Sequence, residues 1–143
     1  MSEPAQPIEI VTRSEAETIA AGRELGGALR AGDVVLLTGP LGAGKTAFVR
    51  GLAAGLGCNP DEVSSPTFTL IQEYPGPLVL QHVDLYRLSP PEADDLGLDE
   101  LSERAVMAVE WPDRWRGAPT TATHVTIAMA GEAARRITVR APG

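Results

Sequence analysis

The chain has 143 residues, of which 43% are hydrophobic, and a formal net charge of −7. This length and hydrophobic content predict a single folded domain over residues 1–143 and exclude a chain that is disordered throughout. Because the net charge is negative and the arginines do not cluster, the isolated chain is a poor candidate for sequence-independent binding to nucleic acid. The single cysteine, Cys58, excludes an internal disulfide and is expected as a small buried side chain.

The N-terminal segment, residues 1–7, contains two prolines and is expected to be loose. It has no basic stretch followed by an apolar one, which a secretory signal would need. No apolar run in the chain reaches the roughly 18 residues of a membrane-spanning helix. The sequence therefore predicts a cytoplasmic protein that does not bind a membrane.

Residues 8–12 predict a short strand, and a helix is expected to follow it. Ser14 and Glu17 have the spacing of a capping box, in which the serine accepts a hydrogen bond from the first helical turn. The helix is predicted to run to about Arg30 and to be closed by Gly32. The neighbourhood of Ser14 could also lie near a bound base, although ordinary helix capping is the simpler interpretation.

A phosphate-binding loop pattern, glycine followed by four residues and Gly-Lys-Thr, occupies residues 39–46. Residues 33–38 before it form an apolar run that is typical of a strand buried on both faces. After the loop, Phe48, Leu52 and Leu56 fall on one stripe of a predicted helix. A strand, a glycine-rich loop and a helix in this order are the context that the motif requires.

The residues of this loop have distinct chemical roles. Gly42 and Gly44 allow a tight turn and leave no side chain between the backbone N–H groups and an anion. Those N–H groups and the helix N-terminus carry partial positive charge for the β-phosphate. Lys45, the only lysine in the chain, would add a full charge near the β- and γ-phosphates, and the Thr46 hydroxyl could hold Mg²⁺. The expected nucleotide-binding residues are Leu41, Gly42, Ala43, Gly44, Lys45, Thr46 and Ala47.

A hydroxyl-rich segment with a proline near its centre occupies residues 63–68. In nucleotide-binding domains, a segment that senses the γ-phosphate often follows the first helix of the nucleotide domain. Thr67 is therefore the candidate for this sensor or for a second magnesium contact. The alternative is that Pro66 shapes the entry into the next strand and Thr67 has no catalytic role.

Residues 68–74 and 78–86 predict two strands joined through Pro-Gly-Pro, hence an antiparallel hairpin. Asp84 ends the second strand, where a carboxylate beside the glycine loop could hold magnesium. His82 lies two positions earlier and so shares the face of Asp84. A hydrogen-bonded structural histidine is favoured over a catalytic one.

Residues 92–103 contain six carboxylates interleaved with leucines and predict one or two short helices. Their surface is either a solvated acidic face or a docking surface for a basic partner.

Residues 105–110 predict a second buried strand, which ends in Glu110. Asp84 and Glu110 would then reach one magnesium site from two strand ends, and the spacing leaves open which acid binds the metal and which binds or activates water. Arg114 and Arg116 could face a triphosphate, although surface positions are the simpler interpretation. The candidate metal ligands are Thr46, Asp84 and Glu110. The candidate catalytic residues are Lys45, Thr67, Asp84 and Glu110.

The C-terminal residues 123–140 predict a β-hairpin, because residues 124–129 and 136–140 alternate and a turn around Gly131 joins them. The elements together predict an α/β fold: a P-loop NTPase-like three-layer domain whose central sheet mixes parallel and antiparallel strands.

Three later motifs follow the glycine loop in order: Ser65-Pro66-Thr67-Phe68, His82-Val83-Asp84-Leu85-Tyr86-Arg87-Leu88 and Glu110-Trp111-Pro112. With these motifs the chain, over roughly residues 14–115, resembles the TsaE family (formerly YjeE) of small bacterial ATPases, which belong to the machinery that makes N6-threonylcarbamoyladenosine in tRNA. The glycine loop alone is shared by many families, whereas the three later motifs together are specific.

This resemblance implies a P-loop fold with a mixed sheet and magnesium-dependent hydrolysis of ATP to ADP. It also implies action through two partner proteins, TsaD and TsaB, in modifying adenosine 37 of tRNAs that read codons beginning with A. The chain would reach tRNA only indirectly, through that complex. By similarity, the backbone of residues 42–47 holds phosphates and Thr46 and Glu110 contact magnesium. Asp84 would support that site, and Thr67 would belong to the switch.

Two other functions remain open at this level. One is a small-molecule kinase on the same fold, which would need an acceptor pocket and an arginine-bearing lid; residues 114–116 are the only short candidate. The other is a nucleotide-regulated binding module whose hydrolysis is incidental. The sequence leaves open which step ATP hydrolysis drives, which residues contact adenine, and the oligomeric state.

Overall fold

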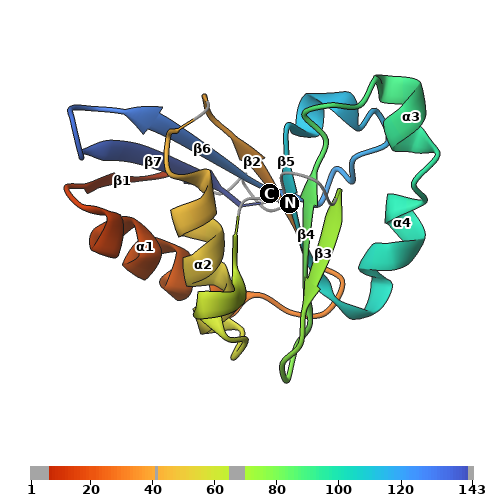
Figure 1. The fold of residues 1–143 in the computed structure, drawn as a ribbon, viewed down its shortest axis with the longest axis horizontal. Coiled ribbons are helices and arrows are strands. Elements are labelled where there is room, and N and C mark those ends of the chain that lie inside the picture. The colour runs from red at the N-terminus through yellow and green to blue at the C-terminus, as the bar shows by residue number, and fades with distance from the viewer. Residues whose placement is uncertain (1–6, 41, 65–69, 142–143) are drawn as a thin grey trace, which may run out of the picture.

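The computed structural model describes residues 7–40, 42–64 and 70–141. In that part of the chain, seven strands form one sheet in the order β1-β7-β6-β2-β5-β4-β3 (Figure 1). The strands are β1 Ile8–Thr12, β2 Val34–Thr38, β3 Ile71–Tyr74, β4 Leu80–Asp84, β5 Val106–Glu110, β6 Thr123–Met129 and β7 Arg135–Arg140. The helices are α1 Glu15–Ala28, α2 Lys45–Gly55, α3 Pro90–Asp94 and α4 Leu98–Leu101, and 3-10 turns span Pro60–Glu62, Ser102–Arg104 and Pro112–Arg114.

The centre of the sheet is parallel and its two sides are antiparallel. β2 pairs in parallel with β5 and β6, and β5 pairs in parallel with β4. β3 joins β4 in antiparallel fashion, and β7 and β1 extend the other side in the same way. The predicted mixed sheet is therefore confirmed. Because parallel strands point the same way, the carboxyl ends of β2, β4, β5 and β6 lie along one edge of the sheet, where ligands of open α/β sheets bind.

Helices cover both faces of this sheet, which gives the predicted three layers. α1 and α2 lie together on one face, and α3 and α4 lie on the other (Figure 1). Val35 and Leu37 of β2 belong to the core with α2, while Val34 and Leu36 belong to the core with α3 and α4. β2 is thus buried on both faces, as its apolar run predicted.

Glycines allow α1 and α2 to pack backbone against backbone. A Cβ atom added at Gly22 of α1 would lie 2.2 Å from the carbonyl oxygen of Phe48, and one added at Gly51 of α2 would lie 2.1 Å from that of Ile19. Real Cβ atoms do not approach backbone so closely, so the contact between these helices requires glycine at both positions. The sequence analysis predicted both helices but not this contact.

The boundaries of α1 differ slightly from the prediction. Ser14 accepts the predicted hydrogen bond from the N–H of Glu17, while the Glu17 carboxylate reaches back to the N–H of Arg13. The helix ends at Ala28 rather than near Arg30, because the next residue is already extended.

Gly32 does not close α1 but lies in the turn that enters β2. Its φ of 91° is in the left-handed region that favours glycine, and its N–H bonds to the carbonyl of Ala105. The prediction that Gly32 closes the helix is therefore wrong.

The predicted hairpin of residues 68–74 and 78–86 is confirmed with shorter strands. β4 ends at Asp84 because the Asp84 carboxylate accepts the N–H of Tyr86 at 2.9 Å, which turns the chain. β3 begins at Ile71, and residues 65–69 lie outside the described part of the chain. The C-terminal hairpin, the short helices of the acidic segment and the buried position of Cys58 also agree with the predictions.

Candidate functional site

The glycine loop connects the carboxyl end of β2 to the N-terminus of α2. Gly42 has a φ of 78° and Gly44 one of 99°, both in the region that side-chain-bearing residues rarely adopt. Gly44 also occupies the position that caps α2, so the helix begins at Lys45 without a side-chain cap. No side chain caps the first N–H groups of the helix in the described part of the chain, so they are able to bind an anion.

A cavity of about 540 Å³ opens at this loop. Seven of the residues that the sequence singled out line it: Gly42, Gly44, Lys45, Thr46, Ala47, Asp84 and Glu110. Ala43, in the same loop, is fully buried. Leu41 and Thr67 lie outside the described residues. Residues from four separate elements therefore converge on one space, as the spacing of the motifs predicted.

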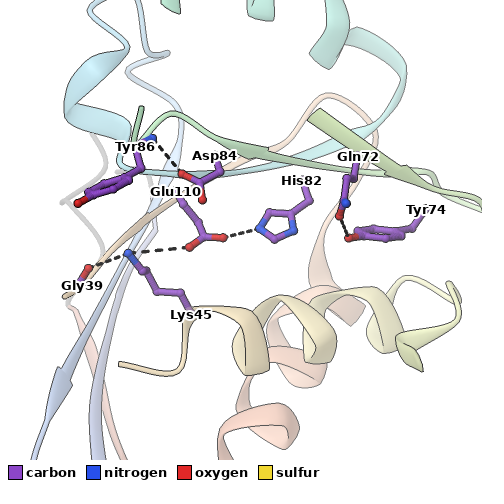
Figure 2. A network of polar contacts seen from close by, with 8 residues as sticks. All are labelled: Gly39, Lys45, Gln72, Tyr74, His82, Asp84, Tyr86 and Glu110. Carbon is purple, nitrogen blue, oxygen red and sulfur yellow. Dashed lines mark hydrogen bonds and ion pairs between the residues drawn. The ribbon is translucent and has the colours of Figure 1, made fainter. Parts of the chain in front are cut away.

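Lys45 is held at the floor of this cavity by three neighbours. Its ammonium donates to the carbonyl of Gly39 at 2.8 Å and lies 3.8 Å from a carboxylate oxygen of Glu110 (Figure 2). It also sits 4.3 Å from the centre of the Trp111 ring. The side chain is only 5% exposed. Burial lowers its pKa, and the charges of Glu110 and Asp84 oppose that effect.

The two acids are direct neighbours across paired strands. Asp84 at the end of β4 is the register partner of Glu110 at the end of β5. Glu110 is almost fully buried and contacts His82 with one oxygen and Lys45 with the other. Among the described residues Asp84 forms no ion pair, and burial raises the pKa of its carboxyl. The site thus holds one carboxylate in direct contact with His82 and Lys45 and one, half-buried, that the Lys45 charge reaches without an ion pair among the described residues.

These donors fit a magnesium ion. Mg²⁺ prefers oxygen ligands and takes one or two carboxylates together with phosphate oxygens and water. The Thr46 hydroxyl and the carboxylates of Asp84 and Glu110 line the same cavity. In the described part of the chain, no three His, Cys, Asp or Glu side chains gather closely enough to hold a metal alone. A metal here would therefore complete its coordination with other oxygen ligands, such as water or a phosphate.

Trp111 adopts an unusual backbone conformation beside the acids. Its φ of 59° is the only positive value at a non-glycine residue in the described chain. A left-handed conformation costs a bulky residue roughly 1–2 kcal/mol. The conformation brings the indole over Lys45 and against the Tyr86 ring, whose centre is 5.0 Å away. Trp111 is therefore a wall of the cavity, a role that its sequence neighbours alone did not indicate.

Arg114 and Arg116, which could face a triphosphate according to the sequence, do not line the cavity. Arg114 donates to the carbonyl of Leu88, and Arg116 pairs with Asp94 of α3, so neither lines the cavity. Both therefore match the simpler interpretation of these arginines as surface residues.

Arg135 and Arg50 line the cavity instead. The Arg135 guanidinium reaches the glycine loop from β7 and donates to the carbonyls of Ala43 at 2.9 Å and Gly42 at 3.4 Å. Arg50 of α2 bonds Glu15 of α1. The alternating pattern of the hairpin contained no signal for this role of Arg135, since the contact joins residues 92 positions apart.

The family of this chain follows from its similarity to known proteins. The model of the family described as threonylcarbamoyl adenosine biosynthesis protein TsaE matches residues 12–137. The chain belongs to the TsaE family. The family takes part in tRNA threonylcarbamoyladenosine biosynthesis, as the names of its members state.

Relatives of the TsaE family align with nearly the whole chain. A protein of a Nostoc species named tRNA threonylcarbamoyladenosine biosynthesis protein TsaE is 40% identical over 92% of this chain and 84% of its own length. The protein of that name from Bacillus subtilis is 43% identical over 89% of this chain and 81% of its own length. The crystal structure of Bacillus subtilis YdiB covers 99% of this chain and 90% of its own, with 35% identity and a TM-score of 0.81. The resemblance inferred from the motifs and the predicted fold class are confirmed.

No helix in the described part of the TsaE-family chain is both long and apolar enough to cross a membrane.

Proposed function

We propose that this TsaE-family chain is a magnesium-dependent ATPase subunit that hydrolyses ATP to ADP and phosphate. Its hydrolysis would drive or reset the TsaB–TsaD complex that makes N6-threonylcarbamoyladenosine at position 37 of tRNAs reading codons that begin with A. The observation that carries the proposal is the single cavity that Lys45, Thr46, Asp84 and Glu110 share at the N-terminus of α2. Phosphoryl chemistry needs a phosphate cradle, a cation and carboxylates in that relation.

The triphosphate would lie against the backbone N–H groups of the glycine loop. The N–H groups that begin α2 have no capping side chain and carry the positive end of the helix dipole. Lys45 would turn from the Gly39 carbonyl and Glu110 toward the β- and γ-phosphates. Its ammonium would then donate to a charged phosphate oxygen instead of the neutral Gly39 carbonyl. This exchange stabilises negative charge that develops on the γ-phosphate during transfer.

Thr46, Asp84 and Glu110 would hold Mg²⁺, which supplies charge stabilisation to the phosphates when bound. Burial and the neighbouring Glu110 raise the pKa of the Asp84 carboxyl, and a bound cation would oppose both effects. Glu110 keeps its contact with His82 at the opposite side of the carboxylate. One of these two acids would also position the attacking water, and Thr67 remains the proposed sensor of the γ-phosphate.

The proposed partners would account for an incomplete site. The cavity is open to solvent, and water at an open site weakens the electrostatic interactions on which transfer depends. We therefore expect slow hydrolysis by the isolated chain and faster hydrolysis with TsaB, TsaD and tRNA present. The small-molecule kinase has no support from the arginines near residue 115, because both bond to other parts of the protein.

The test compares wild-type protein with Lys45→Ala and, as a control, Arg136→Ala, whose side chain lies on the surface and pairs with Glu9. ATP hydrolysis is measured as phosphate release, alone and with TsaB, TsaD and tRNA. We expect Lys45→Ala to reduce hydrolysis at least about 100-fold, because it removes a preorganised charge from the transition state.

The Arg136→Ala control should keep the wild-type rate, and circular dichroism should show both variants folded. A Lys45→Ala variant that hydrolyses ATP normally would refute the ATPase assignment. Two results together would favour the binding module. In the first, the chain retains TsaB and TsaD equally with and without ATP. In the second, a Glu110 variant that binds ATP but cannot hydrolyse it supports the tRNA reaction fully.

A further inference from the structure

The orientation of the Glu110 carboxylate matters most to the site. Glu110 has two polar contacts, one with Lys45 and one with His82, and the first is easier to replace than the second. One oxygen lies 3.8 Å from the Lys45 ammonium. The other lies 2.5 Å from Nε2 of His82 (Figure 2). Only 7% of the Glu110 side chain is exposed, so its carboxylate depends on these neighbours rather than on water.

The contact with Lys45 is the weaker and the more replaceable of the two. The distance of 3.8 Å is beyond hydrogen-bond range, and the same ammonium donates to the Gly39 carbonyl at 2.8 Å. In the ATPase cycle proposed above, Lys45 is also the group that phosphates attract. When Lys45 turns to a phosphate, His82 is the neighbour that stays with Glu110.

His82 is placed so that this contact is its main polar interaction. It lies in β4 two positions before Asp84, and its side chain is fully buried. The residue opposite it on β5 is Ala108, two positions before Glu110, so the imidazole reaches the carboxylate diagonally across the strand pair. Its other ring nitrogen, Nδ1, has no hydrogen-bond partner within the described residues.

We propose that His82 is a positioning residue for Glu110 in the ATPase site, an inference that rests on the function proposed above. Its Nε2 holds one oxygen of Glu110 and so fixes the direction in which the other oxygen faces the cavity. Groups behind a metal-binding or water-positioning carboxylate commonly have this role, and their loss reduces metal affinity or activity about 10- to 100-fold. His82 itself does not touch the nucleotide in this role.

The competing interpretation is that His82 only fills space in the core between β3 and β5. The Tyr74 ring lies 6.4 Å from the imidazole, and Val83 and Ala108 nearby are fully buried. A space-filling residue would affect the stability of the fold but not the metal dependence of the site. The two interpretations therefore differ in measurements that separate stability from metal binding.

The experiment replaces His82 with leucine, asparagine and glutamine. Leucine keeps the volume but removes the donor. Asparagine has its amide near the position of Nδ1, one bond too short to reach Glu110, whereas glutamine can place an N–H near the position of Nε2. The chain offers a matched control, because its second histidine, His124 of β6, is exposed; the same three substitutions are made there.

Metal binding, nucleotide binding, turnover and stability are measured separately for each variant. Mn²⁺ affinity in the presence of ADP is measured by electron paramagnetic resonance, as a substitute for Mg²⁺. Nucleotide affinity without metal is followed by fluorescence of Trp111, which contacts Lys45, in a Trp115→Phe background. Steady-state kcat and KM for ATP and the melting temperature complete the set.

We expect His82→Leu and His82→Asn to lower kcat and Mn²⁺ affinity about 10- to 100-fold while metal-free nucleotide affinity stays unchanged. His82→Gln should retain both quantities within about threefold, because it keeps the donor. The His124 variants should match the wild type. If the leucine variant does not fold, the contrast between asparagine and glutamine carries the same test.

Two results would overturn the role of His82 alone. In the first, all His82 variants keep wild-type kcat and Mn²⁺ affinity. In the second, glutamine and asparagine lose activity equally and in proportion to melting temperature, with metal-free nucleotide binding lost as well. A wild-type chain that binds neither ADP nor Mn²⁺ would instead overturn the proposed function, and the positioning role with it.

Discussion

Lys45 is a buried charge at the centre of the candidate site. A buried ammonium is costly unless it is paired, and here a carbonyl, a carboxylate and an indole share it. None of these partners is as favourable as a phosphate oxygen, because the carboxylate is too distant for a hydrogen bond. The residue is therefore held in place without being neutralised.

Asp84 leads to a prediction about pH. Burial raises its pKa in the folded protein above the value in the unfolded chain. The ionised carboxylate therefore destabilises the metal-free fold at pH values above the folded pKa, and this penalty disappears below the unfolded pKa, where the group is protonated in both states. We expect Asp84→Asn to raise the melting temperature of metal-free protein at neutral pH and to have little effect near pH 3, while reducing ATP hydrolysis at least about 100-fold.

The measurement is thermal denaturation in the presence of a chelator between pH 3 and 8, with Asp113→Asn as the control, since the Asp113 side chain is exposed. A melting temperature that Asp84→Asn lowers at neutral pH would contradict the interpretation that the carboxylate is strained by burial.

Arg135 supports the glycine loop from a distant strand. Its guanidinium bonds the carbonyls of Ala43 and Gly42, and it also bonds the carbonyls of its own turn. Carbonyls that point to Arg135 orient the adjoining N–H groups of the loop the other way. We expect Arg135→Ala to weaken nucleotide binding by about 1–2 kcal/mol, a 5- to 30-fold rise in Kd, because charge-assisted hydrogen bonds to the loop are lost.

Isothermal titration with ADP and with the MgATP complex measures this effect. Its neighbour Arg136 is the matched control, since its side chain is 57% exposed and pairs only with Glu9 in the described residues. Equal affinities in Arg135→Ala and Arg136→Ala would exclude the supporting role.

At the scale of elements, the packing of α1 against α2 fixes the position of α2, whose N-terminus continues from the glycine loop. α1 and α2 approach so closely that Gly51 faces the backbone of Ile19 and Arg23. Gly51→Ala would force the helices apart, and we expect a loss of about 1–3 kcal/mol in the free energy of unfolding. Gly27 of α1 has open space around its Cβ position, so Gly27→Ala should instead stabilise the protein by about 0.5–1 kcal/mol.

Urea denaturation of the two variants measures both changes in one experiment. The opposite signs are the essential expectation, because both substitutions add the same methyl group to a helix. A Gly51→Ala variant as stable as Gly27→Ala would mean that the two helices do not touch in solution as they do in the structure.

At the scale of the whole molecule, the order of the strands assembles the site. β2, β4 and β5 end at one edge, so the loop after β2 meets the acids that end the other two. The antiparallel strand β7 then brings Arg135 from the C-terminal hairpin to the same edge. The acidic segment of residues 92–103 lies on the other face of the sheet from α1 and α2 (Figure 1). Its role as a docking surface for a basic partner stays a prediction.

Much of this protein follows from local patterns in the sequence. The glycine loop, the buried strands β2 and β5, the hairpins and the acids at the ends of β4 and β5 were predicted because each depends on neighbouring residues and a short period. Helix ends were less accurate, as Gly32 shows, since a glycine conformation can serve either a helix end or the next turn.

Only the tertiary structure decided which distant residues meet. His82 contacts Glu110 across 28 positions, Arg135 reaches Ala43 across 92, and Arg116 turns to Asp94 instead of the cavity. No periodicity in one sequence encodes these pairs, because they depend on strand order and register rather than on the residues beside each partner. The sequence by itself therefore determined the chemical groups of the site, and the packing of the sheet determined which side chains hold them in place.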